Sequence, residues 1–591
     1  MRENDLIKKV KVKKGETLID LENIYPIKNV VGTNNYQLYL NDNLVTHNNY
    51  ANKVLINSKI ETEIFIYLAK GYYAKKEPKW DDLFLNHSGW SGGDGIFSFN
   101  LENGADSFDL NKSYQTLFIF GDTFVGRSNL LNNHRLKPHL MVNNSLAYYK
   151  DHQIDFKLNE LDDGSIKAFY HMDDNLDLEG TIPHQLIDEM PKEVLGYVSG
   201  YNPKDLYLLF DFHKEREFSH LNIFNYFNEE DLNLNKRGFK EIEILYSNDN
   251  KDYKSYKKHT LKISNNLNEF EEIPLKIKTR YLKFKVLSNY NDKDFNEGLY
   301  ALNKVAFYHN DKHYLDINIT SNSNLLSEKD NSWIWLQDGA VIGDTLIFYP
   351  FIVNNDKTQP EGLQFRIKGV SLFETKIKDN KLDLTTIKQK RAPLLQKDGV
   401  TEWWFGGGVF PNTKEANALN PDEYIYVYGN KTAFGARDLV LGRVHKDNYK
   451  YFDDYEYYHN GKWVSNMKDA TTLLPHISTE FSVSEIRSGK NKGKYIAVFT
   501  YDVNTAQVAF SIGDNLWGPF SKPQIIYLCP EPEIYQSTTY SYNAKAHPHL
   551  SKSDEILISY NTNTYSWEHN MSDYRVYKPR FISLVEIKEA L

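Results

Sequence analysis

Short apolar and aromatic runs, separated by Gly-rich or Asn-rich turns, recur along most of this chain. Typical runs are Leu117-Phe-Ile-Phe, Tyr424-Ile-Tyr-Val-Tyr and Glu555-Ile-Leu-Ile-Ser-Tyr, which have the length and the residue types of strands. Aromatic residues make up 14% of the sequence, and their rings fit a pleated, half-buried surface better than a helix. The pattern therefore predicts an all-β protein.

Five units share one layout, in which a Gly-rich or polar motif opens the unit and an apolar strand follows. The openings are Trp90-Ser-Gly-Gly-Asp-Gly, Trp335-Leu-Gln-Asp-Gly, Trp404-Phe-Gly-Gly-Gly, Thr479-Glu-Phe-Ser-Val and Tyr542-Asn-Ala-Lys-Ala-His. The strands that follow begin at Thr116, Thr345, Tyr424, Lys494 and Glu555. This repetition predicts a five-bladed β-propeller, whose first strands line a central channel. A large β-sandwich, in which the glycines only mark bulges, is the alternative.

At 591 residues, the chain is too long for one hydrophobic core. The five units are interrupted by a stretch whose strands do not follow the repeated layout. We expect four parts: an N-terminal β extension over residues 1–80, the first part of the propeller over 85–190, an inserted β-sandwich over 190–315 and the remainder of the propeller over 330–591. The opening motifs of such a split propeller converge from distant parts of the sequence.

The inserted stretch has its own order of strands. It contains Ser247-Asn-Asp-Asn-Lys-Asp-Tyr, then Arg280-Tyr-Leu-Lys-Phe, and closes on Val305-Ala-Phe-Tyr. This order resembles the F5/8 type C (discoidin-like) β-sandwich, a fold shared with many carbohydrate-binding modules. The resemblance implies either glycan binding through loops at one end of the sandwich or a structural spacer.

Composition and charge exclude several classes of protein. The net charge of −9 and the pI of about 6.1 argue against a general nucleic-acid binder, which needs a concentrated basic surface. A single cysteine, Cys529, excludes an internal disulfide framework and a thiolate metal cluster. The first residues lack the apolar core of a signal peptide, and no run approaches 18 apolar residues. We therefore expect no membrane span, and a cytoplasmic location unless a leader has been removed.

Two aspartates in the first unit are the leading candidates for chemistry. Asp94 has glycine on both sides, which lets backbone and substrate approach it closely, and Asp122 follows an apolar strand. Burial and a neighbouring carboxylate raise the pKa of a carboxyl group, so a pair of acids can divide into a proton donor and a base or nucleophile. The alternative role for each aspartate is to cap a turn through its side-chain oxygen.

These motifs resemble the DUF5005 and DUF4185 propeller proteins, whose first blade carries Trp-Ser/Thr-Gly-Gly-Asp-Gly and then Phe-Gly-Asp-Thr-Phe. The likeness to DUF5005 extends through Gln337-Asp-Gly, the Phe-Gly-Gly segment at 405 and Tyr542-Asn-Ala-Lys-Ala-His-Pro-His-Leu. The likeness to DUF4185 implies an endo-acting arabinan hydrolase with two catalytic aspartates in its first blade. Carried over to this sequence, it nominates Asp94 and Asp122.

Two further acids open other units and are candidates for the same site. Asp338 stands in the same local setting as Asp94, where it could raise the pKa of a proton donor or bind a sugar hydroxyl. Its alternative role is that of a turn residue before Gly339. Glu480 opens the fourth unit and is the leading substitute for Asp122 as acid or base.

Cationic and aromatic residues at the openings are candidates for substrate binding. Lys545 and His547 offer hydrogen bonds to a carboxylate or a sugar hydroxyl. Trp90, Trp335 and Trp404 offer ring faces for sugars, although aromatic rings also fill β cores. No metal site is predicted, because the His-x-His pair at 547–549 has no evident third ligand.

The predicted function is hydrolysis of a polysaccharide or oligosaccharide, arabinan-like by the resemblance, through paired carboxylates at the propeller channel. A non-catalytic glycan-binding propeller with an accessory module is the alternative, and a carbohydrate lyase or phosphorylase is a third hypothesis. No cofactor is expected to be required, and Ca²⁺ held by carboxylate oxygens is left open as a structural ion. The motifs of nucleotide-binding loops, serine hydrolases and zinc proteases do not occur in the sequence.

Overall fold

The computed structural model of this chain is all-β, with three short helices among the residues that it describes. Those residues are 6–20, 36–40, 43–44, 53–58, 61–68, 72–108, 112–187, 196–291, 297–359, 364–503, 505–535 and 538–586. The helices are α1 (Pro78–Leu83), α2 (Glu531–Ile534) and α3 (Trp567–Ser572). Among the described residues, none of the helices has the length and apolar character that crossing a bilayer requires.

Five separate antiparallel sheets are built by strands on both sides of the insertion. Their inner strands are β9 (Phe97–Asn100), β28 (Gly339–Ile342), β34 (Thr401–Asn412), β40 (Phe481–Glu485) and β44 (Thr539–Ala546). Their second strands are β10 (Thr116–Phe120), β29 (Thr345–Phe348), β35 (Tyr424–Ala433), β41 (Tyr495–Thr500) and β45 (Glu555–Thr564). The five hairpins predicted from the sequence are thus confirmed as strands.

Further strands extend each sheet outward. They are β13 (Ser145–Lys150), β14 (Gln153–Lys157), β31 (Phe365–Lys378), β32 (Lys381–Ala392), β36 (Ala436–His445), β42 (Gln507–Gly513), β43 (Gln524–Leu528) and β46 (Pro579–Glu586). Shorter strands precede or flank the inner ones: β8 (Trp90–Gly93), β11 (Thr123–Ser128), β12 (Arg135–Val142), β27 (Trp333–Trp335), β30 (Phe351–Asn355) and β33 (Leu395–Asp398).

The inner strands lie next to one another in a fixed sequence. β9 contacts β28, β28 contacts β34, β34 contacts β40, and β40 contacts β44. β44 also lies near β9, because the ring of His547, the residue after β44, is hydrogen-bonded to the hydroxyl of Ser98 in β9 at 2.7 Å. This order brings the opening motifs of distant sequence segments to one place.

The last sheet is completed by a strand from the other end of the chain. β7 (Tyr72–Lys76) pairs antiparallel with β46 and forms the outer edge of the sheet β44-β45-β46. The expectation that residues 1–80 form a separate extension is therefore wrong for β7. Strand pairing over such a distance is decided by backbone hydrogen bonds that leave no local pattern in the sequence.

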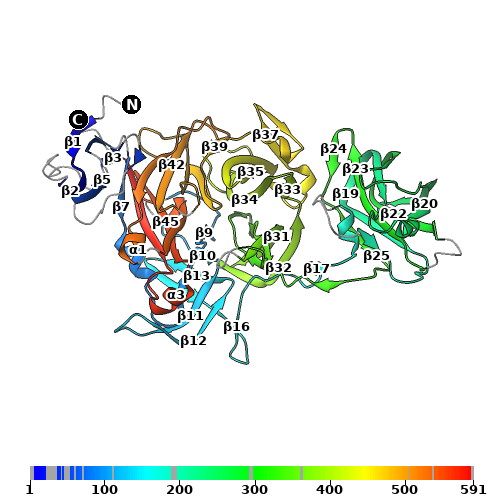
Figure 1. Ribbon diagram of the computed structural model, residues 1–591, viewed down its shortest axis with the longest axis horizontal. Coiled ribbons are helices and arrows are strands. Elements are labelled where there is room, and N and C mark those ends of the chain that lie inside the picture. The colour runs from blue at the N-terminus through cyan, green and yellow to red at the C-terminus, as the bar shows by residue number, and fades with distance from the viewer. Residues whose placement is uncertain are drawn as a thin grey trace.

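The N-terminal strands before β7 form two small sheets of their own. They are β1 (Leu6–Val12), β2 (Gly15–Asp20), β3 (Tyr36–Leu40), β4 (Asn43–Leu44), β5 (Lys53–Ser58) and β6 (Thr62–Leu68). One sheet has the order β1-β6-β3-β4, and β2 pairs with β5 in the other. Figure 1 shows these strands on one side of the five sheets and the inserted strands on the opposite side.

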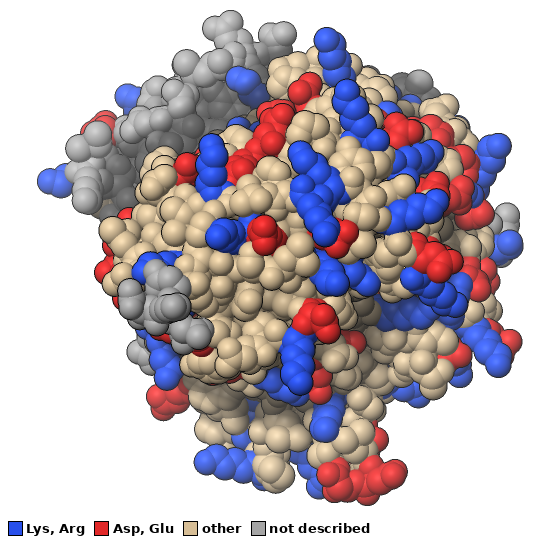
Figure 2. All heavy atoms as spheres, turned by 90° about the vertical axis from the view of Figure 1, so that its right-hand side faces the viewer, with Lys and Arg blue, Asp and Glu red and all other residues tan. Residues whose placement is uncertain are grey.

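The insertion folds around its own hydrophobic core. Its strands are β18 (Tyr197–Val198), β19 (Tyr207–Asn225), β20 (Phe239–Ser247), β21 (Lys254–Thr260), β22 (Glu271–Asn289), β23 (Ala301–His309), β24 (Lys312–Tyr314) and β25 (Asn318–Ser321). Rings of Phe210, Phe284 and Phe307 meet inside it with centroids about 5 Å to 6 Å apart. Its outer end carries Lys and Arg interspersed with Asp and Glu, as Figure 2 shows.

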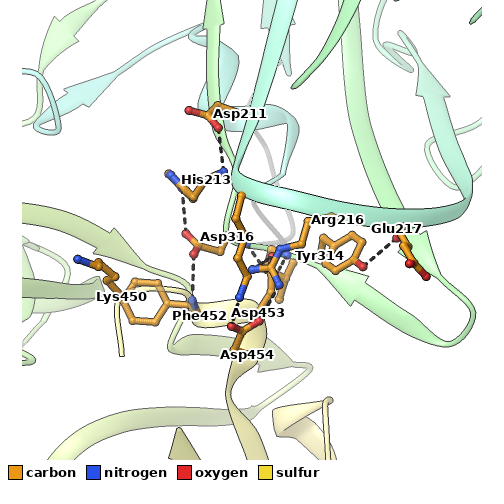
Figure 3. A network of polar contacts seen from close by, with 12 residues as sticks. Asp211, His213, Arg216, Glu217, Tyr314, Asp316, Lys450, Phe452, Asp453 and Asp454 are labelled. Atoms are coloured by element: carbon orange, nitrogen blue, oxygen red, sulfur yellow. Dashed lines mark hydrogen bonds and ion pairs between the residues drawn. The ribbon is translucent and has the colours of Figure 1, made fainter. Parts of the chain in front are cut away.

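Reciprocal polar contacts join the insertion to the second and third sheets (Figure 3). Asp316 of the insertion accepts the backbone N–H of Phe452 at 2.9 Å and pairs with Lys390 of β32 at 2.7 Å. In return, Asp453 accepts the backbone N–H of Leu315 at 2.8 Å. Burial alone would raise the pKa of Asp316, but His213 and Lys390 outweigh it and lower that pKa.

Arg216 of β19 adds an ion pair to the same contact. Its guanidinium lies 2.6 Å from a carboxylate oxygen of Asp454, and Lys214 pairs with the same carboxylate. Because the side chains of Arg216 and Asp454 are largely buried, removal of either one leaves the charge of the other poorly compensated. The contact therefore fixes the insertion on the sheets rather than leaving it on a free linker.

Phe84 is fully buried among the rings of Trp90, Phe118, Phe120 and Phe581. We expect Phe84→Ala to lower the free energy of unfolding by about 3–5 kcal/mol, because it leaves a cavity in a packed core. Phe434→Ala is the matched control, since Phe434 is 90% exposed. Urea denaturation measures both, and equal midpoints for the two variants would contradict this account of the core.

Asp316→Ala should loosen the insertion, because it removes the acceptor of Phe452 and the partner of Lys390. Limited proteolysis under native conditions should then cut faster at the segments that join the insertion to the sheets. Lys376→Ala is the control, because its pair with Asp344 is largely exposed and contributes little. The docking role is wrong if both variants are cut at the wild-type rate.

Candidate functional site

Asp94 and Asp122 lie in neighbouring connections between the first sheet and the three-stranded sheet β12-β11-β8. Asp94 stands between β8 and β9, and Asp122 stands between β10 and β11. The backbone N–H of Asp94 donates to the carbonyl of Asp122 at 3.3 Å, and Gly121 donates to the carbonyl of Asp94 at 2.8 Å. The two aspartates that the sequence nominated are thus brought together by the backbone itself.

Glycines are required around this pair because other chain segments come close. At Gly92, where φ is +152°, a Cβ atom would lie 2.2 Å from the carbonyl oxygen of Tyr577. At Gly121, a Cβ atom would lie 2.5 Å from Oδ1 of Asp94. Gly92 of the first opening and Gly121 before Asp122 therefore permit close packing around the carboxyl groups.

The surroundings of the two carboxyl groups differ. The hydroxyl of Tyr542 donates to Oδ2 of Asp94 at 2.7 Å, and Tyr577 is a second hydrogen-bond partner. Burial raises the pKa of Asp94, whereas these hydroxyls and the charge of Lys545 oppose the rise. Asp94 is therefore the member of the pair whose ionised form is supported.

Asp122 has far less support for its charge. Burial and the neighbouring charge of Asp94 raise the pKa of Asp122 to about 8, and only a long hydrogen bond of 3.4 Å from Asn143 opposes them. A carboxyl group with such a pKa holds its proton at neutral pH. The pair thus combines a supported carboxylate with a neutral acid, the division that acid–base chemistry needs.

The buried ammonium group of Lys545 lies near acids from three other sheets. Its side chain is 2% exposed, and its Nζ lies 3.5 Å from the centroid of the Phe97 ring without a hydrogen-bond partner among the described residues. Burial lowers the pKa of Lys545 to about 8, against the charges of Glu480, Asp338 and Asp94. All four groups therefore share one electrostatic environment.

Asp338 and Glu480 differ in the hydrogen bonds that their carboxyl oxygens accept. Asp338 accepts backbone N–H groups from Gly339 at 2.9 Å and from Val409 at 2.7 Å, so its carboxyl group joins the second sheet to the third. Burial raises the pKa of Asp338 to about 7. Burial also raises the pKa of Glu480, whose hydrogen bond from Gln337 is long at 3.4 Å. The carboxyl group of Glu480 is therefore held by weaker hydrogen bonds than that of Asp338.

His547 is buried and has a structural role, because neither of its ring nitrogens is available to a substrate. Its two ring nitrogens are hydrogen-bonded at 2.7 Å to the hydroxyls of Ser98 and Ser559, and burial lowers its pKa. The adjoining cavity has a volume of about 50 Å³, with Asp106, Asp338 and Lys545 in its lining. Such a space holds a few water molecules rather than a sugar.

Two of the three tryptophans are too deeply buried to provide the sugar platforms that the sequence suggested, and for Trp335 that role stays a prediction. Trp90 is 2% exposed and stacks on Phe156, and Trp404 is 6% exposed with its Nε1 donating to Glu402 at 3.0 Å. Trp335 is half-buried, and its ring meets Phe365 edge-on at 4.4 Å. Each ring fills space between strands, because the openings pack against neighbouring sheets.

Two tyrosines at the site were missed from the sequence. Tyr542 is part of the fifth opening, so its position next to Lys545 was a usable signal. Tyr577 lies in an irregular segment after α3, and its hydroxyl donates to the carbonyl of Asp122 at 3.1 Å. No local motif marks Tyr577, and only the tertiary fold brings it to the first sheet.

Three solved structures are similar to parts of this chain. A structure described as a "putative hydrolase" from Bacteroides ovatus ATCC 8483 is 15% identical, with coverage of 87% of this chain and 92% of its own and a TM-score of 0.46. The module CBM32-3 of a family 31 glycoside hydrolase from Clostridium perfringens is 19% identical (19% and 73% covered, TM-score 0.16). The GH43_1 enzyme from Xanthomonas citri is 10% identical (44% and 88% covered, TM-score 0.17). With TM-scores below 0.5, these likenesses carry no argument about function.

Family models match two stretches of the chain, and no curated protein matches it. The F5/8 type C domain matches residues 178–298, which include most of the inserted sheet. The domain of unknown function DUF5005 matches residues 291–586, which is half of the chain. That match contains Asp338, Glu480 and Lys545, whereas Asp94 and Asp122 precede it. This chain belongs to the DUF5005 family and carries an F5/8 type C domain.

Proposed function

We propose that this protein is a glycoside hydrolase, with Asp94 and Asp122 as its catalytic pair. The observation that carries the proposal is the adjacency of two half-buried carboxyl groups with unlike surroundings. Cleavage of a glycosidic bond needs one carboxyl group to protonate the leaving oxygen and a second to activate water or attack the anomeric carbon. Asp122 suits the first role and Asp94 suits the second.

The arrangement of the five sheets supports a β-propeller as the scaffold of this site. The inner strands follow one another from β9 to β44, and His547 links β44 back to β9. In a propeller the ends of these strands face one channel, so acids from several blades share a single site. We propose that Asp94, Asp338, Glu480 and Lys545 meet there.

The remaining groups adjust the protonation of the pair. Hydrogen bonds with Tyr542 and Tyr577 favour the charged form of Asp94 and so oppose the rise in pKa that burial causes, and the charge of Asp94 helps to raise the pKa of Asp122. Glu480 is the alternative proton donor, because burial raises its pKa and its hydrogen bond from Gln337 is long. Lys545 balances the charge of the acids without contacting them.

The substrate class rests on the inserted domain and on the first-sheet motifs. A glycan-binding F5/8 type C domain raises the local concentration of a polymer at the site by tethering it. The resemblance of the Asp94 and Asp122 motifs to DUF4185 proteins makes arabinan the first polymer to test. We propose a polysaccharide or oligosaccharide as the substrate.

Asp94→Asn and Asp122→Asn should each lower kcat for glycan hydrolysis by about 100-fold to 10,000-fold, because each removes one half of the acid–base pair. Reducing-sugar release from a panel of polysaccharides measures this effect. Asp344→Asn is the matched control, since the side chain of Asp344 is 69% exposed and lies in a distant turn.

The outcomes of this experiment separate two functions. Loss of cleavage in both variants with Asp344→Asn unaffected supports the pair. Loss in Glu480→Gln together with retained activity in Asp122→Asn would move the proton donor to Glu480. Binding of a glycan by the wild type without any cleavage would replace the enzyme with a glycan-binding propeller.

The pH dependence of kcat/KM should reflect the two carboxyl groups separately. Activity should fall as pH rises through about 8, because Asp122 then loses the proton that it donates. Tyr542→Phe removes a hydrogen bond that favours the charged form of Asp94, so the acid limb should move to higher pH. Steady-state kinetics across pH tests both limbs, and an unmoved acid limb in Tyr542→Phe would remove Asp94 from the role of base or nucleophile.

A further inference from the structure

One exposed aromatic ring is connected to Asp94 through two further tyrosine rings of the last sheet. Tyr565, at the end of β45, is 51% exposed and stacks on Tyr540 with ring centroids 4.4 Å apart. The ring of Tyr540 is 5.2 Å from that of Tyr542, whose hydroxyl donates to Asp94. A continuous path of rings therefore leads from Asp94 to the surface.

A second exposed ring lies on the side of Asp122. Trp567, the first residue of α3, is 59% exposed, and its ring is 5.5 Å from Phe124 of β11. Phe124 meets the ring of Tyr577 at 5.2 Å, and the Tyr577 hydroxyl donates to the carbonyl of Asp122. Figure 1 shows α3 beside β11, in agreement with the contact between the rings of Trp567 and Phe124. Tyr565 and Trp567 are two positions apart in the sequence, so both exposed rings belong to one short segment.

This segment is held in place rather than extended into solvent. The backbone N–H of Tyr565 donates to the carbonyl of Thr538 at 3.1 Å. Ser566 caps α3, because its hydroxyl accepts the backbone N–H of His569 at 3.2 Å. Exposed aromatic rings on a fixed backbone lose little conformational freedom when a ligand covers them.

The charge around the carboxyl pair is predominantly acidic, whereas the guanidinium of Arg135 lies 4.0 Å from the centroid of the Phe124 ring on the Trp567 side. Asp94, Asp338 and Glu480 surround Lys545, whose side chain is 2% exposed and so is covered from an incoming ligand. Arg437 faces Glu480 and Glu402. An anionic sugar would bring a further negative charge into this group of acids, which disfavours its binding.

We infer that the substrate is an extended chain of neutral sugars, with consecutive sugar rings on Tyr565 and Trp567 while a glycosidic bond lies at Asp94 and Asp122. Sugar rings present apolar C–H faces that pack on aromatic rings, and a neutral chain adds no charge beside the acids. Two exposed rings beyond the carboxyl pair require more than one sugar unit. The inference rests on the proposed function and deepens it.

The test uses the full-length protein and measures binding apart from cleavage. Affinity electrophoresis in gels with arabinan, arabinoxylan, galactan or mannan compares the wild type with Tyr565→Ala and Trp567→Ala. We expect each alanine variant to bind a retained neutral polymer about 10-fold more weakly. The control variants Tyr565→Phe and Trp567→Phe keep a ring and should bind as the wild type does. Polygalacturonate, an acidic polymer, should not retard any variant.

Each outcome decides one of the two proposals. Weaker binding in the alanine variants, with retention in the phenylalanine variants, supports the sugar platform even if no polymer is cleaved, in which case the hydrolase proposal alone fails. Cleavage with an unchanged KM in both alanine variants overturns the platform and leaves the hydrolase. Preferential retardation by polygalacturonate, or retardation by none of the neutral polymers, also overturns the inference.

Discussion

The candidate site depends on one constraint, the burial of carboxyl groups near the ends of the inner strands and of β10. Most residues of the inner strands are buried, so an acid near the end of one lies against buried neighbours. Burial is the first cause of the raised pKa of Asp94, Asp122, Asp338 and Glu480. A fold that only needed stability would avoid four such groups in one region, which is why their concentration indicates function.

The neighbours of these acids decide what each can do. Asp338 receives two backbone N–H groups and joins two sheets, whereas Asp122 receives one long hydrogen bond and keeps its proton. Asp94 differs from both, because tyrosine hydroxyls form hydrogen bonds with its carboxyl group and favour its charged form. The same residue type thus takes a structural role, an acidic role and an ionised role within one site, according to its hydrogen-bond donors.

Hydrogen-bond donors also surround the buried carboxyl groups where the insertion meets the sheets. Asp316 and Asp453 each accept backbone N–H groups from the other side of the contact, and the cations Lys390 and Arg216 offset their charge. Buried carboxylates are costly unless such donors surround them. The reciprocal arrangement therefore gives a few polar residues a direct part in setting where the insertion lies.

The sequence by itself determined the strands and the acids. Periodic apolar runs identified all five second strands, and glycine or strand-end settings identified Asp94 and Asp122, because both signals are local. Only the tertiary structure decided that β7 completes the last sheet, that Trp90 and Trp404 are core residues, and that Tyr577 meets the first sheet. The contacts of β7 and Tyr577 join residues more than 450 positions apart, and the rings that pack on Trp90 and Trp404 come from other strands more than 50 positions away. Local patterns show which residues can be buried, whereas the neighbours that bury them, and therefore their pKa and exposure, arise only when the sheets assemble.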